Sequence, residues 1–409
     1  MEVLRPNMKK LLLAISVCTA VTCGCESTPK PSSVASNVEN IKTYNLTDCK
    51  VYNERGQYNE AIKACENTLS QGISESAIYL GDIYLFGRGD QQIDVNKALS
   101  YYEMEGGVKG LYKAARVYEK GINTDINLSK ALSYYEKAAN LGDILSANYV
   151  ANSYLKGRAV GKDPQKAIHY LTIAADAGDA KSQYQLAKFY EEGKIVPEDD
   201  ELAYIYFSKA AAQKNIDALY EKAVMEENGI GTEKNISKAI ETYRELVMRS
   251  NYTQALFSLG KLLITTSSNH DDHTDGIGYL EQASKKQFLP AKLYLAIQYY
   301  KGEVVDQNTS KGLDLLKECI SRGYPPAMYA LAQVYENGTG VVKNDASAYA
   351  WYRLAFDCGI HKAENMYKTA YSNATLRGIV KLADNKYVEY SQLYKCVKNY
   401  DPRILQDLL

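Results

Sequence analysis

The amino-acid sequence predicts an all-α fold: a right-handed superhelical solenoid of helical hairpins. One observation is a repeat, because a small residue recurs every 33 to 37 residues. Another is the spacing inside each repeat, where aromatic residues follow the small residue at helical intervals. A third is the 36 Tyr against 6 Phe and 1 Trp, since Tyr can bury its ring while its hydroxyl stays at the wet edge. The recurring small residues are Ala98, Ala131, Ala167, Ala203, Ala239, Gly276, Gly312 and Ala348.

Composition and charge exclude several classes of function. The 409 residues carry 48 Lys and Arg against 49 Asp and Glu, a net charge of -1. No strong field therefore draws the chain to nucleic acid or to anionic lipid, and we expect no nucleic-acid partner. The 4 His leave little material for a histidine-rich metal or acid–base centre.

Residues 1–24 have the features of a lipoprotein signal peptide. Lys9 and Lys10 precede an apolar run from Leu11 to Val21, which is too short to span a bilayer. The following residues, 22–25, resemble a bacterial lipoprotein box, which implies that Cys25 receives the lipid. The alternative is ordinary signal-peptidase cleavage nearby, in which case Cys25 carries no lipid and remains a thiol.

Residues 25–40 are predicted to form a flexible tether that starts at the lipidated Cys25. The segment is rich in Ser, Pro, Thr and Asn, a composition typical of linkers. Glu26 stands in the second mature position in place of Asp, which under the sorting rule of such lipoproteins favours the outer membrane. We therefore expect an outer-membrane anchor facing the periplasm, with the cell surface or secretion as the alternative.

Residues 41–72 resemble one tetratricopeptide-type hairpin that precedes the main repeats. Cys49 stands where the first helix needs a small buried residue, and Cys65 lies on the inner face of the second helix. Facing positions of one hairpin are within disulfide range, which predicts a bond between these two cysteines. Five cysteines follow Cys25, so at least one stays free or pairs between chains, and Cys319 occupies a buried small-residue position. The sequence leaves open whether Cys358 and Cys396 pair.

Residues 73–372 are predicted to form eight hairpin units. The first helix of each unit has its own small residue, followed in most units by an aromatic residue three positions on and by Gly six positions on. Gly after an apolar helical stretch predicts a left-handed cap that ends the helix. Glu226 and Leu263 depart from the aromatic pattern. The small residues of the first helices are Gly81, Ala115, Ala151, Ala187, Ala223, Gly260, Ala296 and Ala332.

The pattern of these units resembles the Sel-1-like repeat family, a relative of the tetratricopeptide repeat. Tyr329 to Val341 together with Ala348 to Tyr352 is the copy most similar to the family pattern. The resemblance implies a binding scaffold, similar to the Sel-1-like lipoproteins that assist alginate and other exopolysaccharide export. After the repeats, residues 373–409 contain two further helical stretches and are expected to form a C-terminal helical cap.

No segment of the sequence has the pattern of a catalytic or cofactor site. The Gly-rich turns lack the strand–loop–helix context and the Gly-Lys-Ser/Thr ending of phosphate loops. His270, Asp271, Asp272 and His273 offer metal-ligand atoms, but we expect them in a solvated loop, which would orient ligands poorly. We therefore predict no enzyme activity, no cofactor and no metal.

The residues that follow the small residues of the first helices form a row predicted to line a concave surface. Charged and aromatic side chains of this kind are common at interfaces, and we expect them to bind a protein partner of the cell envelope, with a polysaccharide chain as a further ligand. Inter-repeat packing is an equally weighted explanation for the tyrosines. The predicted binding residues are Arg116, Asn152, Lys188, Lys261, Tyr184 and Tyr220.

The leading hypothesis for function is a non-enzymatic scaffold in an envelope or exopolysaccharide export complex. An alternative is a secreted or surface-displayed factor that binds a host protein, as other exported relatives of the family do. A third hypothesis, penicillin binding or hydrolysis, has only the cysteine-rich relatives in its support, and their regular cysteine pairs are missing from this sequence.

Overall fold

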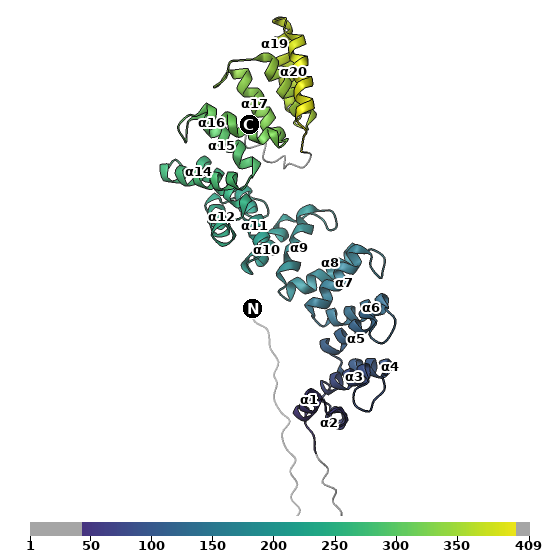
Figure 1. Cartoon of the computed structure of the whole chain (residues 1–409). Coiled ribbons are helices and arrows are strands. Elements are labelled where there is room, and N and C mark those ends of the chain that lie inside the picture. Colours follow the sequence, from purple (N-terminus) through teal and green to yellow (C-terminus); the bar gives the residue numbers. More distant parts are fainter. Residues whose placement is uncertain (1–42, 398–409) are drawn as a thin grey trace, which may run out of the picture. The chain divides into compact units, whose positions relative to one another are not determined.

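The computed structural model describes residues 43–397, in which all regular structure is helical (Figure 1). The twenty helices of this range belong to one compact unit that starts at Asn45. The all-α solenoid predicted from the sequence is confirmed. The predictions about the signal peptide, Cys25 and the tether lie outside the described residues, as does the end of the C-terminal cap.

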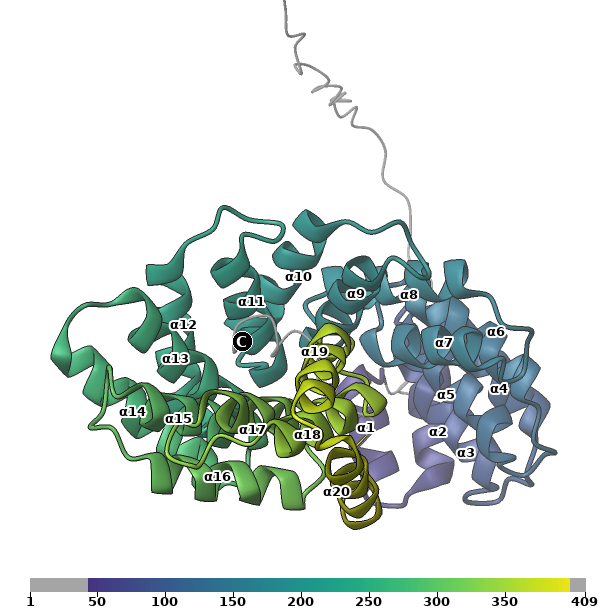
Figure 2. The same cartoon turned by 90° about the horizontal axis from the view of Figure 1, so that it is seen from above.

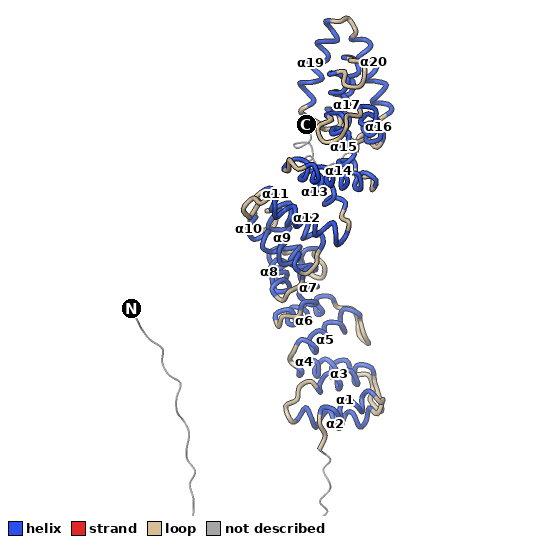
Figure 3. The backbone as a smooth tube through the Cα atoms, turned by 90° about the vertical axis from the view of Figure 1, so that its left-hand side faces the viewer, coloured by secondary structure: helices blue, strands red, loops and turns tan. Residues whose placement is uncertain are grey.

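The helices follow one another as hairpins in chain order, joined by short loops (Figure 3). Their bounds are α1 Leu46–Glu54, α2 Tyr58–Ser70, α3 Ser76–Phe86, α4 Val95–Glu105, α5 Val108–Lys120, α6 Leu128–Asn140, α7 Ile144–Lys156, α8 Pro164–Asp176, α9 Ala180–Glu192, α10 Asp200–Ala212, α11 Ile216–Asn228, α12 Ile236–Ser250, α13 Thr253–Thr266, α14 His270–Lys285, α15 Leu289–Lys301, α16 Thr309–Ser321, α17 Pro325–Asn337, α18 Asp345–Asp357, α19 Ala363–Leu376 and α20 Val380–Leu393. Each helix packs against the next, and α18 contacts both α19 and α20 (Figure 2). The eight predicted units correspond to the pairs from α3–α4 to α17–α18.

Local chemistry sets where the helices begin and end. In most units an Asp or Asn before the second helix accepts a hydrogen bond from the backbone N–H three residues on, as Asp94 does from Lys97 at 2.9 Å. The first helices of seven units end at the predicted glycines, such as Gly87 with φ +60°. The left-handed caps expected from the sequence are therefore confirmed.

The small residues allow the two helices of a unit to approach closely. The alanines among them are almost completely buried, with exposed fractions of 0 to 1%. In the sixth unit both positions are glycine, and a Cβ on Gly260 would lie 2.7 Å from the carbonyl oxygen of Gly276. Backbone therefore meets backbone between α13 and α14, and a methyl group on either glycine would separate the helices.

Disulfide bonds join cysteines near both ends of the described chain. Cys49 and Cys65, the predicted pair, are bonded between α1 and α2 with 4.8 Å between their Cα atoms. Cys358 and Cys396, whose pairing the sequence left open, are also bonded. Cys319 is a free, buried thiol, and burial raises its pKa to about 12. Of the five cysteines after Cys25, it is the one without a disulfide partner in the chain.

The structure corrects two expectations. His270 to His273 do not lie in a loop but form the first turn of α14, because Asn269 caps this helix and acidic residues are favourable at a helix N-terminus. Asp272 accepts a hydrogen bond from Ser267 at 2.6 Å, and Ser267 also contacts His273. The second correction concerns the boundary after residue 372, which falls inside α19. This helix lacks the repeat pattern, and it contacts α18 as extensively as the two helices of one unit contact each other.

Candidate interaction surface

One register position on the first helices holds four of the six predicted binding residues, Arg116, Asn152, Lys188 and Lys261. We call this set, with its equivalents in the other units, the first-helix row. Its members are Asp82, Arg116, Asn152, Lys188, Val224, Lys261, Ile297 and Gln333. Because they share one register position, they repeat once per unit along the solenoid.

Lysines of the first-helix row form ion pairs between neighbouring units. Lys188 on α9 pairs with Glu191 on its own helix and, at 3.3 Å, with Glu221 on α11. Burial opposes the charge of Lys188, but these two carboxylates outweigh it and raise its pKa. Lys261 on α13 pairs in the same way with Glu227 on α11 at 3.4 Å. These ammonium groups therefore hold successive units together.

The other predicted binding residues differ in how accessible they are. Arg116 is half exposed, donates a hydrogen bond to Tyr112 at 3.3 Å and lies 3.5 Å from Glu119. Asn152 on α7 is exposed. Of the six predicted residues, Asn152 therefore offers the most accessible side chain.

The two predicted tyrosines are half-buried and take part in packing. The ring of Tyr184 lies 5.6 Å from that of Phe207. The ring of Tyr220 lies 6.0 Å from Tyr243 and 5.3 Å from Tyr252. These contacts agree with the packing explanation that the sequence left open beside the binding one.

A second set of contacts links the two helices inside a unit. In three of the four units in which the second helix carries Tyr four residues after its small residue, the hydroxyl donates to an acidic residue sixteen positions earlier, at 2.5 to 2.9 Å. In the first unit, Tyr102 donates instead to Asp82. Where that Tyr is Leu171, the residue sixteen positions earlier is Leu155. This coupling was not predicted, although the spacing of sixteen is visible in the sequence. The pairs are Tyr135 with Glu119, Tyr243 with Glu227 and Tyr352 with Glu336.

In the first four units a stacked pair of tyrosines fills the space between the two helices. The rings of Tyr154 and Tyr170 lie 6.2 Å apart and are nearly parallel, and the ammonium of Lys166 lies 5.1 Å from the centre of the Tyr154 ring. Equivalent lysines lie over Tyr84, Tyr118 and Tyr299. The repeated lysine therefore stabilises the aromatic residue of the first helix.

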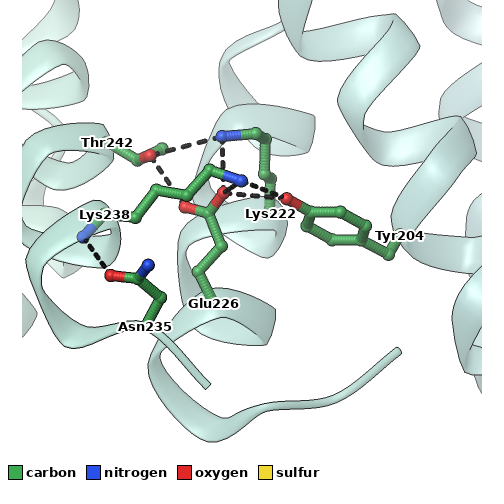
Figure 4. A network of polar contacts seen from close by, with 6 residues as sticks. All are labelled: Tyr204, Lys222, Glu226, Asn235, Lys238 and Thr242. Atoms are coloured by element: carbon green, nitrogen blue, oxygen red, sulfur yellow. Dashed lines mark hydrogen bonds and ion pairs between the residues drawn. The ribbon is translucent and has the colours of Figure 1, made fainter. Parts of the chain in front are cut away.

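Glu226 replaces this aromatic residue in the fifth unit and is completely buried (Figure 4). Its carboxylate pairs with Lys222 at 2.8 Å and with Lys238 at 3.0 Å, and Lys238 is the equivalent of the repeated lysine. Thr242 and Tyr204 donate hydrogen bonds to the same carboxylate at 2.8 and 3.0 Å. Burial alone would raise the pKa of Glu226, but these donors outweigh it and lower the pKa. From the sequence this residue was only a departure from the pattern.

Within residues 43–397, no group of three or more His, Cys, Asp or Glu side chains is arranged to hold a metal ion. In the same range, no helix has both the length and the apolarity needed to cross a membrane.

Comparison with known proteins supports a repeat architecture. The Sel1 repeat model matches seven segments that together make up more than half of the chain. It leaves out residues 245–288, which hold α13 and α14, where the Gly turn is missing and the small residues are both glycine. The matched segments are 74–104, 108–143, 144–179, 180–215, 216–244, 289–324 and 325–360.

Several solved structures are similar to this one. A protective antigen of uropathogenic Escherichia coli with an SLR fold is 21% identical, covers 85% of this chain and 73% of its own, and has a TM-score of 0.54. A Sel1 repeat protein from Oxalobacter formigenes is 21% identical, with coverage of 79% and 89% and a TM-score of 0.49. Cysteine rich protein B of Helicobacter pylori is 28% identical over 32% of this chain and 92% of its own, with a TM-score of 0.25. No curated protein matches the chain. At these identities, the similarity to the Escherichia coli antigen concerns the fold.

Proposed function

Since the chain belongs to the Sel1 repeat family, whose members are in general scaffolds for protein interaction, we propose that it binds protein partners in the cell envelope through its first-helix row. The observation that carries this proposal is the regular repetition of the row over eight first helices, which gives a partner contacts at successive units. The most accessible of the predicted binding residues is Asn152. Arg116 and Lys188 contribute charge beside it.

An outer-membrane lipid anchor at Cys25, facing the periplasm, is the second part of the proposal. It is supported by the short apolar run, the lipoprotein-like box and the polar segment that follows. Two disulfide bonds support it further, because disulfides persist in oxidising compartments such as the periplasm. The resulting function is a non-catalytic scaffold that assists assembly of an envelope complex, with exopolysaccharide export as the specific process.

Partner capture tests the binding surface. A photo-crosslinking amino acid is placed at Asn152, on the first-helix row, and in a control at Ser133, which is exposed on α6. We expect the crosslinker at position 152 to form a crosslink with a discrete envelope protein, and the crosslinker at position 133 to form none with that protein. Failure to capture any protein from position 152, or equal capture from both positions, would remove the row as the binding surface.

Fractionation and protease shaving test the location. Cys25→Ser should release the protein from the membrane or leave an uncleaved precursor, because the lipid is then absent. Added protease should spare the wild-type protein in intact cells and cut it after the outer membrane is opened. Unchanged fractionation of the variant contradicts the lipid anchor. Cleavage in intact cells would favour the surface-displayed factor instead.

A further inference from the structure

A cleft of about 300 Å³ lies between α15 and α17, at the junction of the seventh and eighth units. Its walls combine aliphatic atoms with amide and hydroxyl groups, and the exposed ammonium of Lys301 belongs to its lining. None of the residues that line it is acidic. They are Ile297, Tyr300, Lys301, Leu316, Ala330, Gln333, Val334, Asn337 and Thr339.

The hydroxyl of Tyr300 is buried in this region without a hydrogen-bond partner among the described residues. Burial raises the pKa of Tyr300 to about 12, with smaller contributions from Tyr335 and Asp314, so the phenol keeps its proton and remains a donor. Asp314 is exposed on α16 and does not line the cleft. A buried donor without an acceptor costs about 1–3 kcal/mol, which an incoming acceptor would recover.

The repeat pattern indicates which acceptor is missing. Tyr300 stands four residues after Ala296, the register position that holds Glu336 in the next unit. There Glu336 accepts a hydrogen bond from Tyr352. In the seventh unit the phenol takes the place of the carboxylate, and Leu316 takes the place of the tyrosine. This unit therefore has the phenol of Tyr300 at the position of the carboxylate, and no acidic residue to accept its hydrogen bond.

We propose that this cleft binds a peptide segment of a protein partner in which an aliphatic side chain neighbours an Asp or Glu. The aliphatic side chain packs against Ile297, Leu316 and Val334, while the carboxylate pairs with Lys301. When the Tyr300 side chain turns toward the cleft, its hydroxyl donates a hydrogen bond to the same carboxylate. The absence of acidic residues from the lining favours a negatively charged ligand. This inference rests on the proposed role in protein binding and adds a site and a peptide class to it.

The test uses random nonapeptides displayed on phage and selected on the full chain. We expect enriched peptides to contain an acidic residue next to an aliphatic one. The most enriched peptide is then synthesised with its carboxylate and with the matching amide, and its Kd is measured by fluorescence anisotropy. Tyr300→Phe and Lys301→Gln should each weaken binding by about 10-fold, as expected for a hydrogen bond or ion pair to a carboxylate. Lys156→Gln, at the equivalent exposed position of α7, should leave the Kd unchanged.

Further readouts separate binding from structure. The amide peptide should bind the wild type about 10-fold more weakly but lose little more on Lys301→Gln, because both changes remove the same ion pair. Tyr300→Phe should melt at the same or a higher temperature, since it removes an unpaired buried hydroxyl. Enrichment of peptides without an acid, no enrichment at all, or an unchanged Kd for Tyr300→Phe would overturn the proposal. Partner capture from Asn152 is independent of these outcomes, so failure of the cleft is distinguishable from failure of the scaffold role.

Discussion

Glu226→Gln should destabilise the middle of the solenoid by about 3 kcal/mol. The substitution keeps the shape of the side chain but leaves Lys222 and Lys238 without their carboxylate. The side chain of Lys222 is only 19% exposed, so its charge-assisted bond contributes about 1.5–3 kcal/mol. The side chain of Lys238 is 47% exposed and turns to solvent more easily. Its ion pair with Glu226 therefore contributes less than about 1 kcal/mol to stability.

Urea unfolding and hydrogen exchange of α11 and α12 would measure this loss. Glu245→Gln is the matched control, because Glu245 pairs with Arg249 at the surface, where loss of the pair costs about 0.5 kcal/mol or less. Glu226→Tyr should recover part of the loss, since it restores the ring that other units place beneath the repeated lysine. A free energy of unfolding for Glu226→Gln within 1 kcal/mol of wild type would refute the reasoning.

The pH dependence provides a second check of the same network. The pKa of Glu226 is lowered by folding, so its contribution is fully present above the ordinary Glu pKa of about 4.3 and is lost as the pH falls through the folded value. Gln does not titrate. The difference in stability between wild type and Glu226→Gln should therefore shrink below about pH 4, and a difference that stays constant from pH 7 to pH 3 would contradict the assignment.

Three further predictions concern other parts of the chain. Replacing Cys49 and Cys65 together by Ala should lower the free energy of unfolding by roughly 3 kcal/mol in the chain-entropy account of a loop of this size, and equal urea midpoints would count against it. Cys319 should resist iodoacetamide at pH 8 in the folded protein and react after denaturation, because its thiol is buried and keeps its proton. Mass spectrometry that finds the Cys319 adduct in the folded protein would contradict this prediction. Tyr243→Phe should cost about 1–2 kcal/mol, since it removes the buried hydroxyl that donates to Glu227, and thermal melting that matches the wild type would show that this bond adds nothing.

The sequence was sufficient for features that depend on local chemistry or on the period of the repeat. Gly87 and its equivalents end helices because of their own backbone freedom, and the small residues are buried because each unit repeats the same contact. Partners between units were not predictable in this way. Lys188 meets Glu221, 33 residues away, only because α9 and α11 pack in one particular register. Asn269 was a usable signal for the start of α14 that the sequence analysis overlooked.

The candidate site was predictable as a set of register positions but not as a set of accessible side chains. The row was recognised from its spacing, whereas the accessibility of Lys188 and Lys261 depends on carboxylates of a neighbouring helix. The cleft beside Tyr300 was not predicted, because it depends on two replacements on different helices. Tyr300 replaces the acidic residue on α15, and Leu316 replaces the tyrosine on α16. Neither Tyr300 nor Leu316 is unusual when its helix is considered separately.

The two disulfides change where the solenoid is expected to come apart. Arrays of this kind ordinarily fray from their ends, because a terminal unit has only one neighbour. Here covalent links close the hairpin at one end and tie residue 396 back to α18 at the other. We therefore expect the first opening inside the array, at a junction between two units, where consecutive helices contact each other less than the two helices of one unit do. Brief digestion of the native protein would then yield two large protected fragments, and reduction would shift the early cuts to the termini.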